Sequence, residues 1–103
     1  MKNTELYIKQ EYGTYLEGFS FVKPSVIHTI IANDYILSIN RRTLKIDASG
    51  IISNIKTIEN STAFIRVYNI NTTRTRVIYP EQSYIYIKNR PKVPTIQIIK
   101  AQP

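Results

Sequence analysis

Apolar and polar residues alternate with a period of two along the second half of the chain. Residues 77–89 read VIYPEQSYIYIKN, in which a proline turn precedes a run of alternating isoleucines and tyrosines. Successive side chains of a strand point to opposite faces of a sheet, so Ile85 and Ile87 enter a core only when Tyr84 and Tyr86 point away from it. The pattern therefore predicts a strand with one buried face and one face that carries tyrosines.

Turn signals divide the rest of the chain into similar short runs, of about five to eight residues, a spacing typical of β-sandwiches and barrels. No run has apolar residues at helical spacing over three turns. We expect one all-β domain over residues 1–103, an immunoglobulin-like sandwich of two sheets with roughly seven to nine short antiparallel strands. The candidate strands are residues 6–10, 15–21, 26–31 (with a short helical turn as the alternative), 35–39, 43–46, 51–55, 63–68, 74–79, 83–88 and 95–100.

The core candidates are apolar residues on the expected inward faces of the later strands. On the strand before the proline turn, Arg74 and Arg76 share one face with Ile78, and Val77 lies on the other face, which we expect in the core. The full set of core candidates is Ile65, Val67, Val77, Ile85, Ile87, Ile96 and Ile98.

The positive charge of the chain belongs to its last two thirds. The net charge is +7, but residues 1–34 hold 3 basic and 4 acidic side chains, whereas residues 35–103 hold 11 and 3. Such asymmetry indicates a nucleic-acid surface, an acidic protein partner or a solvated face. There is no cysteine, which excludes disulfides and thiolate zinc sites. No apolar run approaches the length of a membrane span, and we expect neither an export signal nor a membrane anchor.

The sequence contains no constellation of residues that indicates catalysis. The single histidine, His28, lies in the apolar stretch VIHTII, where a structural role is the commoner one. The carboxylates show no paired spacing for metal binding or acid–base chemistry, and the three glycines lie in separate turns rather than in a phosphate-binding loop. We therefore expect a protein that is not an enzyme and that uses no metal or cofactor.

The outward faces of the later strands combine aromatic and basic side chains. Their members are Phe64, Arg66, Tyr68, Arg74, Arg76, Tyr84, Tyr86 and Lys88. Three interpretations remain open: a docking face for a protein partner, tyrosines that pair across an exposed sheet, or a small basic β-barrel that binds single-stranded nucleic acid. A second basic spot, NRRTLK with Arg41, Arg42 and Lys45, is expected to be a solvated turn.

The stretch IYPEQSYIYIKN, in which a proline turn starts an alternating strand, gives the chain a family likeness. It resembles the small immunoglobulin-like β-sandwich proteins that tailed bacteriophages carry as auxiliary, or decoration, proteins of the capsid. Glu81 stands where glycine often follows the proline in this pattern. The resemblance implies a non-enzymatic virion protein, made in the host cytoplasm, that binds the major capsid protein and reinforces the capsid lattice.

Overall fold

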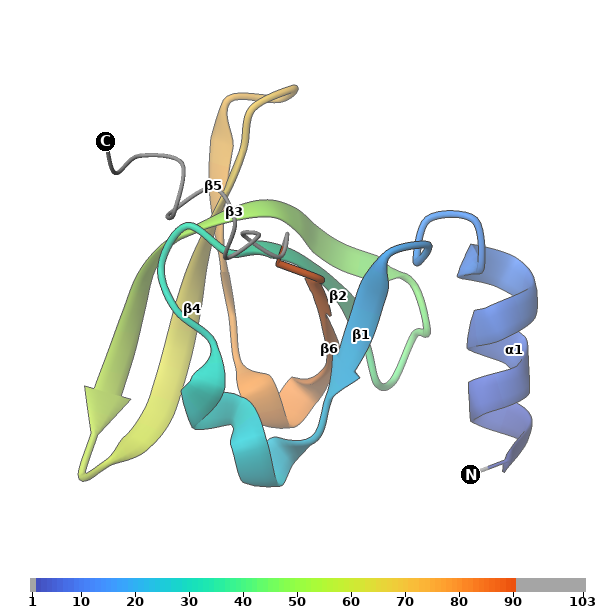
Figure 1. The fold of residues 1–103 in the computed structure, drawn as a ribbon, viewed down its shortest axis with the longest axis horizontal. Coiled ribbons are helices and arrows are strands. Elements are labelled where there is room, and N and C mark those ends of the chain that lie inside the picture. The colour runs from blue at the N-terminus through green and yellow to red at the C-terminus, as the bar shows by residue number, and fades with distance from the viewer. Residues whose placement is uncertain (1, 91–103) are drawn as a thin grey trace, which may run out of the picture.

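The fold is a single six-stranded antiparallel sheet with a helix at its N-terminal end (Figure 1). The computed structural model describes residues 2–90. The elements in chain order are α1 (Lys2–Tyr12), β1 (Phe19–Val22), the 3₁₀ helix η1 (Pro24–Thr29), β2 (Tyr35–Asn40), β3 (Ile46–Ile58), β4 (Ser61–Asn69), β5 (Arg74–Ile78), the 3₁₀ helix η2 (Pro80–Gln82) and β6 (Ser83–Lys88). The all-β class is confirmed. The two sheets of a sandwich are not confirmed, because the described residues form one sheet, and the candidate strand at 95–100 lies outside them.

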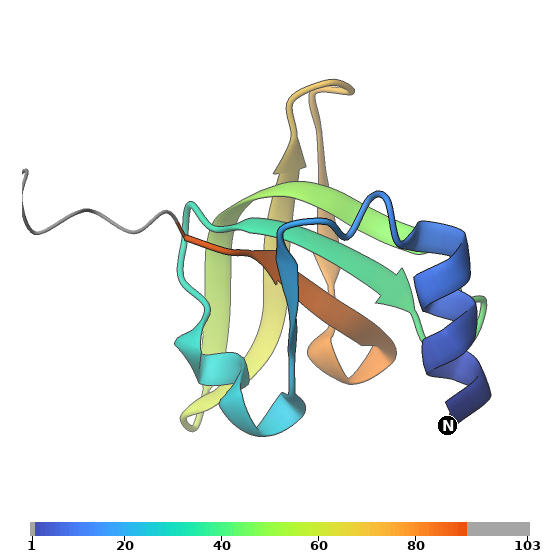
Figure 2. The ribbon, with the colours of Figure 1, turned by 45° about the vertical axis from the view of Figure 1, so that its right-hand side comes forward.

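The sheet has the strand order β1-β6-β2-β3-β4-β5 and is strongly curved, so that it wraps around its own core (Figures 1 and 2). Much of this curvature lies in β3, which is 13 residues long. Its pairing with β4 is interrupted between Ile52 and Asn54 and again between Lys56 and Thr57. Interruptions of this kind bend a strand and increase its twist. The long strand β3 therefore extends through both sides of the curved sheet.

Gly50 allows β3 and β4 to approach each other closely. Its φ is 150°, and a Cβ at this position would lie 2.1 Å from the carbonyl oxygen of Tyr68. The residue pairs with Ile36 in the middle of the sheet. The prediction of separate strands at 43–46 and 51–55 is therefore wrong, because this glycine serves a close backbone contact inside one strand and not a turn.

The main core lies on the concave face of the sheet, which we call the inner face. Its buried members are Ile30, Ile36, Ala48, Ile52, Ile65, Val67, Ile78, Ile85 and Ile87. Four of the core candidates are thus confirmed, while Ile96 and Ile98 lie outside the described residues. Val77 is wrong: it is 40% exposed, and Ile78 is the buried residue, at 1%. The reason is that Val77 pairs with Arg66 on the outer face, whereas Ile78 pairs with the buried Ile65 on the inner face.

Helix α1 covers part of the opposite, outer face. Ile8 packs there with Leu37 and Ile39 of β2, and Tyr12, four residues further along α1, adjoins the same cluster. The predicted strand at 6–10 is wrong. Residues four apart share a face of a helix, and the Lys, Glu, Leu and Gln of this segment favour helix. The helix ends before Gly13, where a Cβ would lie only 2.5 Å from the carbonyl oxygen of Lys9.

Two other N-terminal predictions are corrected. The candidate strand at 26–31 is mostly the 3₁₀ helix η1, in agreement with the alternative of a short helical turn. Pro24 occupies its start, where the missing N–H costs nothing. The candidate strand at 15–21 is reduced to Phe19–Val22, because the chain turns at residues 13–18 after α1.

An ion pair between the exposed Arg90 and the buried Asp34 ties the end of the described chain to the loop before β2. Arg90 donates from Nε to Asp34 Oδ1 at 3.0 Å and from Nη2 to Asp34 Oδ2 at 2.7 Å. Asp34 also accepts from the Ile31 amide at 3.1 Å, and its side chain is only 7% exposed. The hydrogen bond from Arg90 is the main cause that lowers the pKa of this carboxyl, with a smaller contribution from Ile31.

We expect Asp34→Asn to lower the free energy of unfolding by about 2 kcal/mol at neutral pH, because charge-assisted hydrogen bonds to a buried carboxylate are lost. The folded-state pKa of Asp34 lies below its unfolded value of about 3.9, so its contribution is present above that pH and disappears as the pH falls through the folded pKa. Urea unfolding between pH 7 and pH 2 should show the two proteins converging in acid.

The matched control is Asp47→Asn, which removes the other ion pair seen among residues 2–90. Asp47 meets Arg76 at 3.4 Å, with 66% of the arginine side chain exposed. An exposed pair of this kind contributes little, so we expect a change within about 0.5 kcal/mol. Equal effects of the two substitutions would contradict the role given to Asp34.

Candidate functional site

The structure places the predicted docking residues in three different regions. Strands β4 and β6 are separated by β2 and β3 in the sheet, so their outward residues do not form one patch. Phe64, Arg66 and Tyr68 of β4 and Lys88 of β6 lie on the uncovered part of the outer face, Tyr84 and Tyr86 lie beneath α1, and Arg74 and Arg76 lie on the inner face of β5.

The uncovered part of the outer face spans β2 to β5 and continues to the end of β6. Cross-strand pairing aligns Tyr35 with Ile51 and Ile51 with Tyr68 in one row, and Arg66 with Val77 in the next. Sequence analysis missed several of these residues, because their neighbours in the sheet come from other strands. We call this surface the open outer face and define it by Tyr35, Ile51, Lys56, Phe64, Arg66, Tyr68, Val77 and Lys88.

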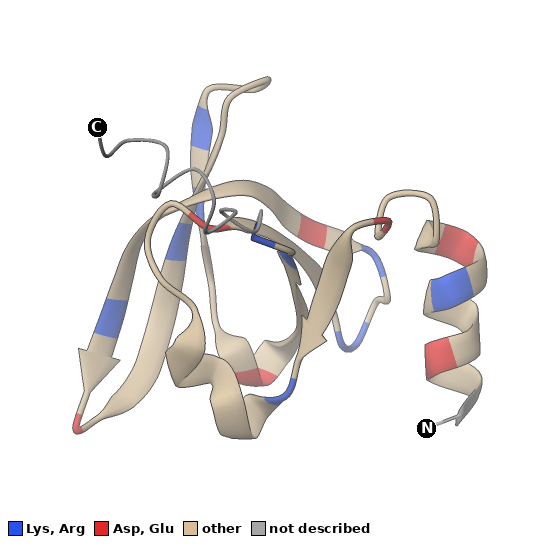
Figure 3. Ribbon diagram, viewed as in Figure 1, with Lys and Arg blue, Asp and Glu red and all other residues tan. Residues whose placement is uncertain are grey.

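The open outer face is positively charged. It carries Lys56, Arg66 and Lys88, and Asp47 is the one carboxylate within the bounds of β3, β4 and β5. Asp47 bonds Arg76 on the inner side. Figure 3 shows basic segments on β3, β4 and β5, whereas α1 carries residues of both signs. A partner that approaches this face therefore meets cations without compensating anions.

Cations and aromatic rings lie close together on the open outer face. The guanidinium carbon of Arg66 is 5.7 Å from the ring centroid of Phe64, and Lys88 Nζ is 5.8 Å from that of Tyr35. Contacts at this range are weakly attractive at exposed positions. They hold the long side chains over the rings while leaving their charged ends in water.

Tyr84 and Tyr86 occupy the covered part of the outer face. Both are half-buried and pack against the cluster beneath α1. The ring centroid of Phe21 lies 6.5 Å from that of Tyr84 and 5.4 Å from that of Tyr86. Burial raises the pKa of the Tyr86 hydroxyl, and Glu5 and Tyr84 raise it further, so this hydroxyl is neutral at physiological pH. These tyrosines are therefore not free to act as anchors on a flat docking surface.

Tyr12 fixes the position of α1 over this cluster. Its hydroxyl donates to the carbonyl oxygen of Leu44, in the turn between β2 and β3, at 2.8 Å. Asn40 Oδ1 accepts from the amides of Arg42 and Thr43 at 2.8 and 3.0 Å and orders the same turn. The turn at residues 40–45, which was expected to be only solvated, thus helps to hold α1 in place.

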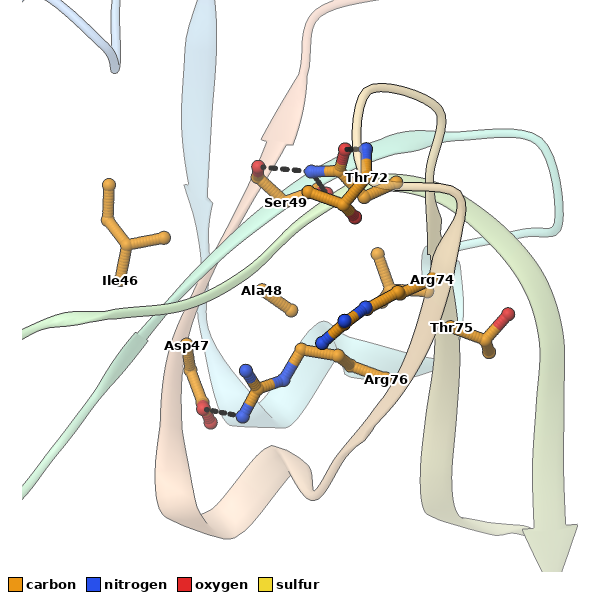
Figure 4. Close-up of a pocket in the computed structure, with 10 residues that line it drawn as sticks. Ile46, Asp47, Ala48, Ser49, Thr72, Arg74, Thr75 and Arg76 are labelled. Carbon is orange, nitrogen blue, oxygen red and sulfur yellow. Dashed lines mark hydrogen bonds and ion pairs between the residues drawn. The ribbon is translucent and has the colours of Figure 1, made fainter.

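Arg74 and Arg76 line a pocket of about 680 Å³ on the inner side, between β3 and β5. Figure 4 shows Arg76 reaching from β5 to Asp47 on β3, with the ion pair of 3.4 Å drawn as a dashed line. Above it, Asn69 donates to the carbonyl oxygen of Ser49 at 2.9 Å. Because Asp47 already neutralises Arg76, this pocket presents less net positive charge than its two arginines suggest.

No group of three His, Asp or Glu side chains among the described residues is placed to hold a metal ion. His28 is exposed on η1. No helix within residues 2–90 has the length and apolar character to cross a membrane.

Comparison with known proteins adds no family to these observations. No protein-family model, curated protein or solved structure matches the chain significantly.

Proposed function

We propose that this chain is a non-enzymatic attachment protein that docks on an acidic protein surface through the open outer face. The observation that carries the proposal is the composition of that face, which combines aromatic rings with cations and contains no carboxylate. Aromatic residues and arginine are enriched at the cores of protein interfaces, where carboxylates are depleted. The other half of the same face is covered by α1 and serves the fold.

The central residues of the open outer face are already partly ordered. Phe64 and Tyr68 are half-buried, so their rings lose little conformational freedom on binding. Arg66 is exposed, and its planar guanidinium can bind a carboxylate through two parallel hydrogen bonds while its stem rests against Phe64. Lys56 and Lys88, at the two ends of the face, would speed encounter with an acidic partner at low salt.

The proposed partner is the major capsid protein of a tailed bacteriophage, and this part of the proposal rests on the resemblance of residues 78–89. The chain would then be an auxiliary virion protein, made in the host cytoplasm, that attaches to the capsid lattice and reinforces it. Residues 80–88 form η2 and β6, and β6 lies between β1 and β2 inside the sheet. Contact with the lattice would therefore fall to the open outer face.

A second candidate function is the binding of single-stranded nucleic acid. The row Tyr35, Ile51 and Tyr68 places two tyrosines on one face, on β2 and β4 with Ile51 of β3 between them. Arg66 and Lys88 lie on the same face. Bases stack on tyrosine rings while the backbone follows the cations. The two candidate functions are distinguished by whether the chain binds an acidic polypeptide or single-stranded nucleic acid more tightly.

Binding of the full chain to two probes, poly-L-glutamate and a 20-nucleotide oligothymidylate, tests the docking face. We expect tighter binding to the polypeptide at matched salt, and roughly tenfold weaker binding after Lys56→Gln with Arg66→Gln, because charged anchors at an interface commonly carry this much affinity. The control pair Arg42→Gln with Lys45→Gln removes the same charge from the turn after β2 and should bind as the unaltered protein does.

Two results would overturn this part of the proposal. Equal losses in the two double variants would mean that binding follows net charge and not the open outer face. Tighter, steeply salt-dependent binding to the oligonucleotide, reduced by Tyr68→Leu, would assign the face to nucleic acid instead.

The capsid partner is tested by measuring the chain in purified particles of the virus that encodes it. Quantitative mass spectrometry should find it in a fixed ratio to the major capsid protein. Absence from the particles would refute the capsid partner. The role of the open outer face would then depend on the experiment with the two probes alone.

A further inference from the structure

A pocket of about 410 Å³ lies between α1 and the strands β1 and β6 (Figures 1 and 2 show these elements). Its volume falls within the range of sites for small organic ligands. Three rings line it, those of Phe21, Tyr84 and Tyr86, and the two tyrosine centroids are 5.4 to 6.5 Å from that of Phe21. The rings are tilted against one another, which leaves apolar faces for a further flat group. We call this space the aromatic pocket.

Arg41 supplies the cation of the aromatic pocket and is held in place from two directions. Its backbone amide donates to the carbonyl oxygen of Gln82 at 3.0 Å. Its guanidinium carbon lies 4.5 Å from the ring centroid of Tyr84, within the range of a cation–π contact. The charge is therefore positioned before any ligand arrives, which reduces the entropic cost of binding.

The hydrogen-bonding capacity of Arg41 is not satisfied within the described residues. Its Nε is buried without a hydrogen-bond partner. Among residues 2–90, ion pairs join Arg76 to Asp47 and Arg90 to Asp34, and none includes Arg41. Buried donors in folded proteins are ordinarily paired, so an unpaired donor indicates a missing partner. An anionic group is the partner that a guanidinium binds most strongly.

A second unpaired atom lies beside Arg41. Ser83 Oγ is buried without a partner among the described residues, and both residues line a smaller cavity of about 160 Å³ next to Val22 and Ile85. Ser83 faces the inner side of β6 with Ile85 and does not line the aromatic pocket, so Arg41 is the unsatisfied residue that lines both spaces.

We propose that the aromatic pocket binds a small ligand that joins a planar ring to an anionic group. The ring lies among Phe21, Tyr84 and Tyr86, and the anion pairs with Arg41. Glu5 also lines the pocket, from α1, and its carboxylate opposes a high negative charge on the ligand. The aromatic pocket is separate from the open outer face, because it lies on the part of the outer face that α1 covers.

Calorimetric titration of the full chain tests the site with two acids, 3-phenylpropionate and adenosine 5′-monophosphate, and with their neutral counterparts, 3-phenylpropanamide and adenosine. We expect saturable binding of at least one acid, with its neutral counterpart roughly tenfold weaker or more, since a charge-assisted hydrogen bond is lost. The acid that binds distinguishes a carboxylate ligand from a nucleotide.

Three variants separate the site from general charge effects. Arg41→Gln should weaken binding roughly tenfold or more, whereas Arg42→Gln, which changes the same charge at the next residue, should leave it unchanged. Glu5→Gln should strengthen binding roughly two- to fivefold, because a repelling carboxylate is removed. This gain cannot arise from a protein that has lost its fold.

The proposal fails if neither acid binds at concentrations up to roughly 10 mM, about the weakest affinity that would mark a specific site. It fails as well if Arg41→Gln and Arg42→Gln weaken binding equally, or if Glu5→Gln has no effect while the Arg41 variant keeps its native spectrum. In those cases ordered water satisfies Arg41 and Ser83.

Discussion

Replacing Gly50 with alanine should lower the free energy of unfolding by about 2 to 5 kcal/mol, through backbone strain and steric overlap together. The φ of 150° is a conformation that side chains disfavour, and the new Cβ would come within 2.1 Å of the Tyr68 carbonyl oxygen. Relief would require β3 and β4 to separate where their pairing holds the curved sheet together. Urea denaturation followed by circular dichroism measures the change.

Gly18→Ala is the matched control for this substitution. Gly18 also has a positive φ, 79°, but none of the described atoms beyond its chain neighbours would lie within 4 Å of a Cβ added there. We expect a loss of about 1 kcal/mol from backbone strain alone. Similar losses at the two glycines would show that the close approach to Tyr68 contributes nothing.

Ile8→Ala should release α1 from the sheet. Ile8 is 3% exposed and is the residue of α1 that is buried in the cluster with Leu37 and Ile39. Truncation of a buried isoleucine costs about 2 to 5 kcal/mol, so amide hydrogen exchange in α1 should become roughly thirtyfold faster or more. The amides of β3 and β4 should change less, because the main core lies on the other face.

Leu6→Ala on the same helix provides the comparison, since Leu6 is 54% exposed. Alanine has a slightly higher helix propensity than leucine, so the exchange rates in α1 should stay within a factor of a few of the original. If both variants accelerate exchange alike, α1 is held by its own helicity and by Tyr12, and Ile8 is not its anchor.

The alternation of side chains was sufficient to predict the later strands and most of their core. In β4 and β6, Ile65, Val67, Ile85 and Ile87 are buried as expected, because a period of two has only one arrangement that hides all of them. In β5 the alternation also holds, but the wrong face was expected in the core. Ile78 shares the inner face with Arg74 and Arg76, and two arginines on one face of an isolated strand favour the opposite assignment.

The site could be predicted only in part because strand order is not a local property. Phe64, Arg66 and Tyr68 were recognised together since one strand carries them. Their assignment to one face with Tyr84 and Tyr86 assumed that β4 and β6 are neighbours, whereas two strands lie between them. The helix that covers the tyrosines was also predicted as a strand, since only Ile8 and Tyr12 mark its apolar side. Arg41 entered the sequence analysis as a solvated residue, because its stacking on Tyr84 brings together residues far apart in the chain.

The position of β6 also determines when the chain can complete its fold. Strand β1 pairs with β6, with Phe19 opposite Lys88, so its partner is the last of the six strands to leave the ribosome. Strands β2 to β5 are neighbours both in sequence and in the sheet, and such local pairings form early. During synthesis, β1 therefore waits unpaired while almost 70 further residues are added, as the pairing of residues 19 and 88 requires. The time for which β1 lacks its partner is therefore set by the rate at which residues 23–88 are translated.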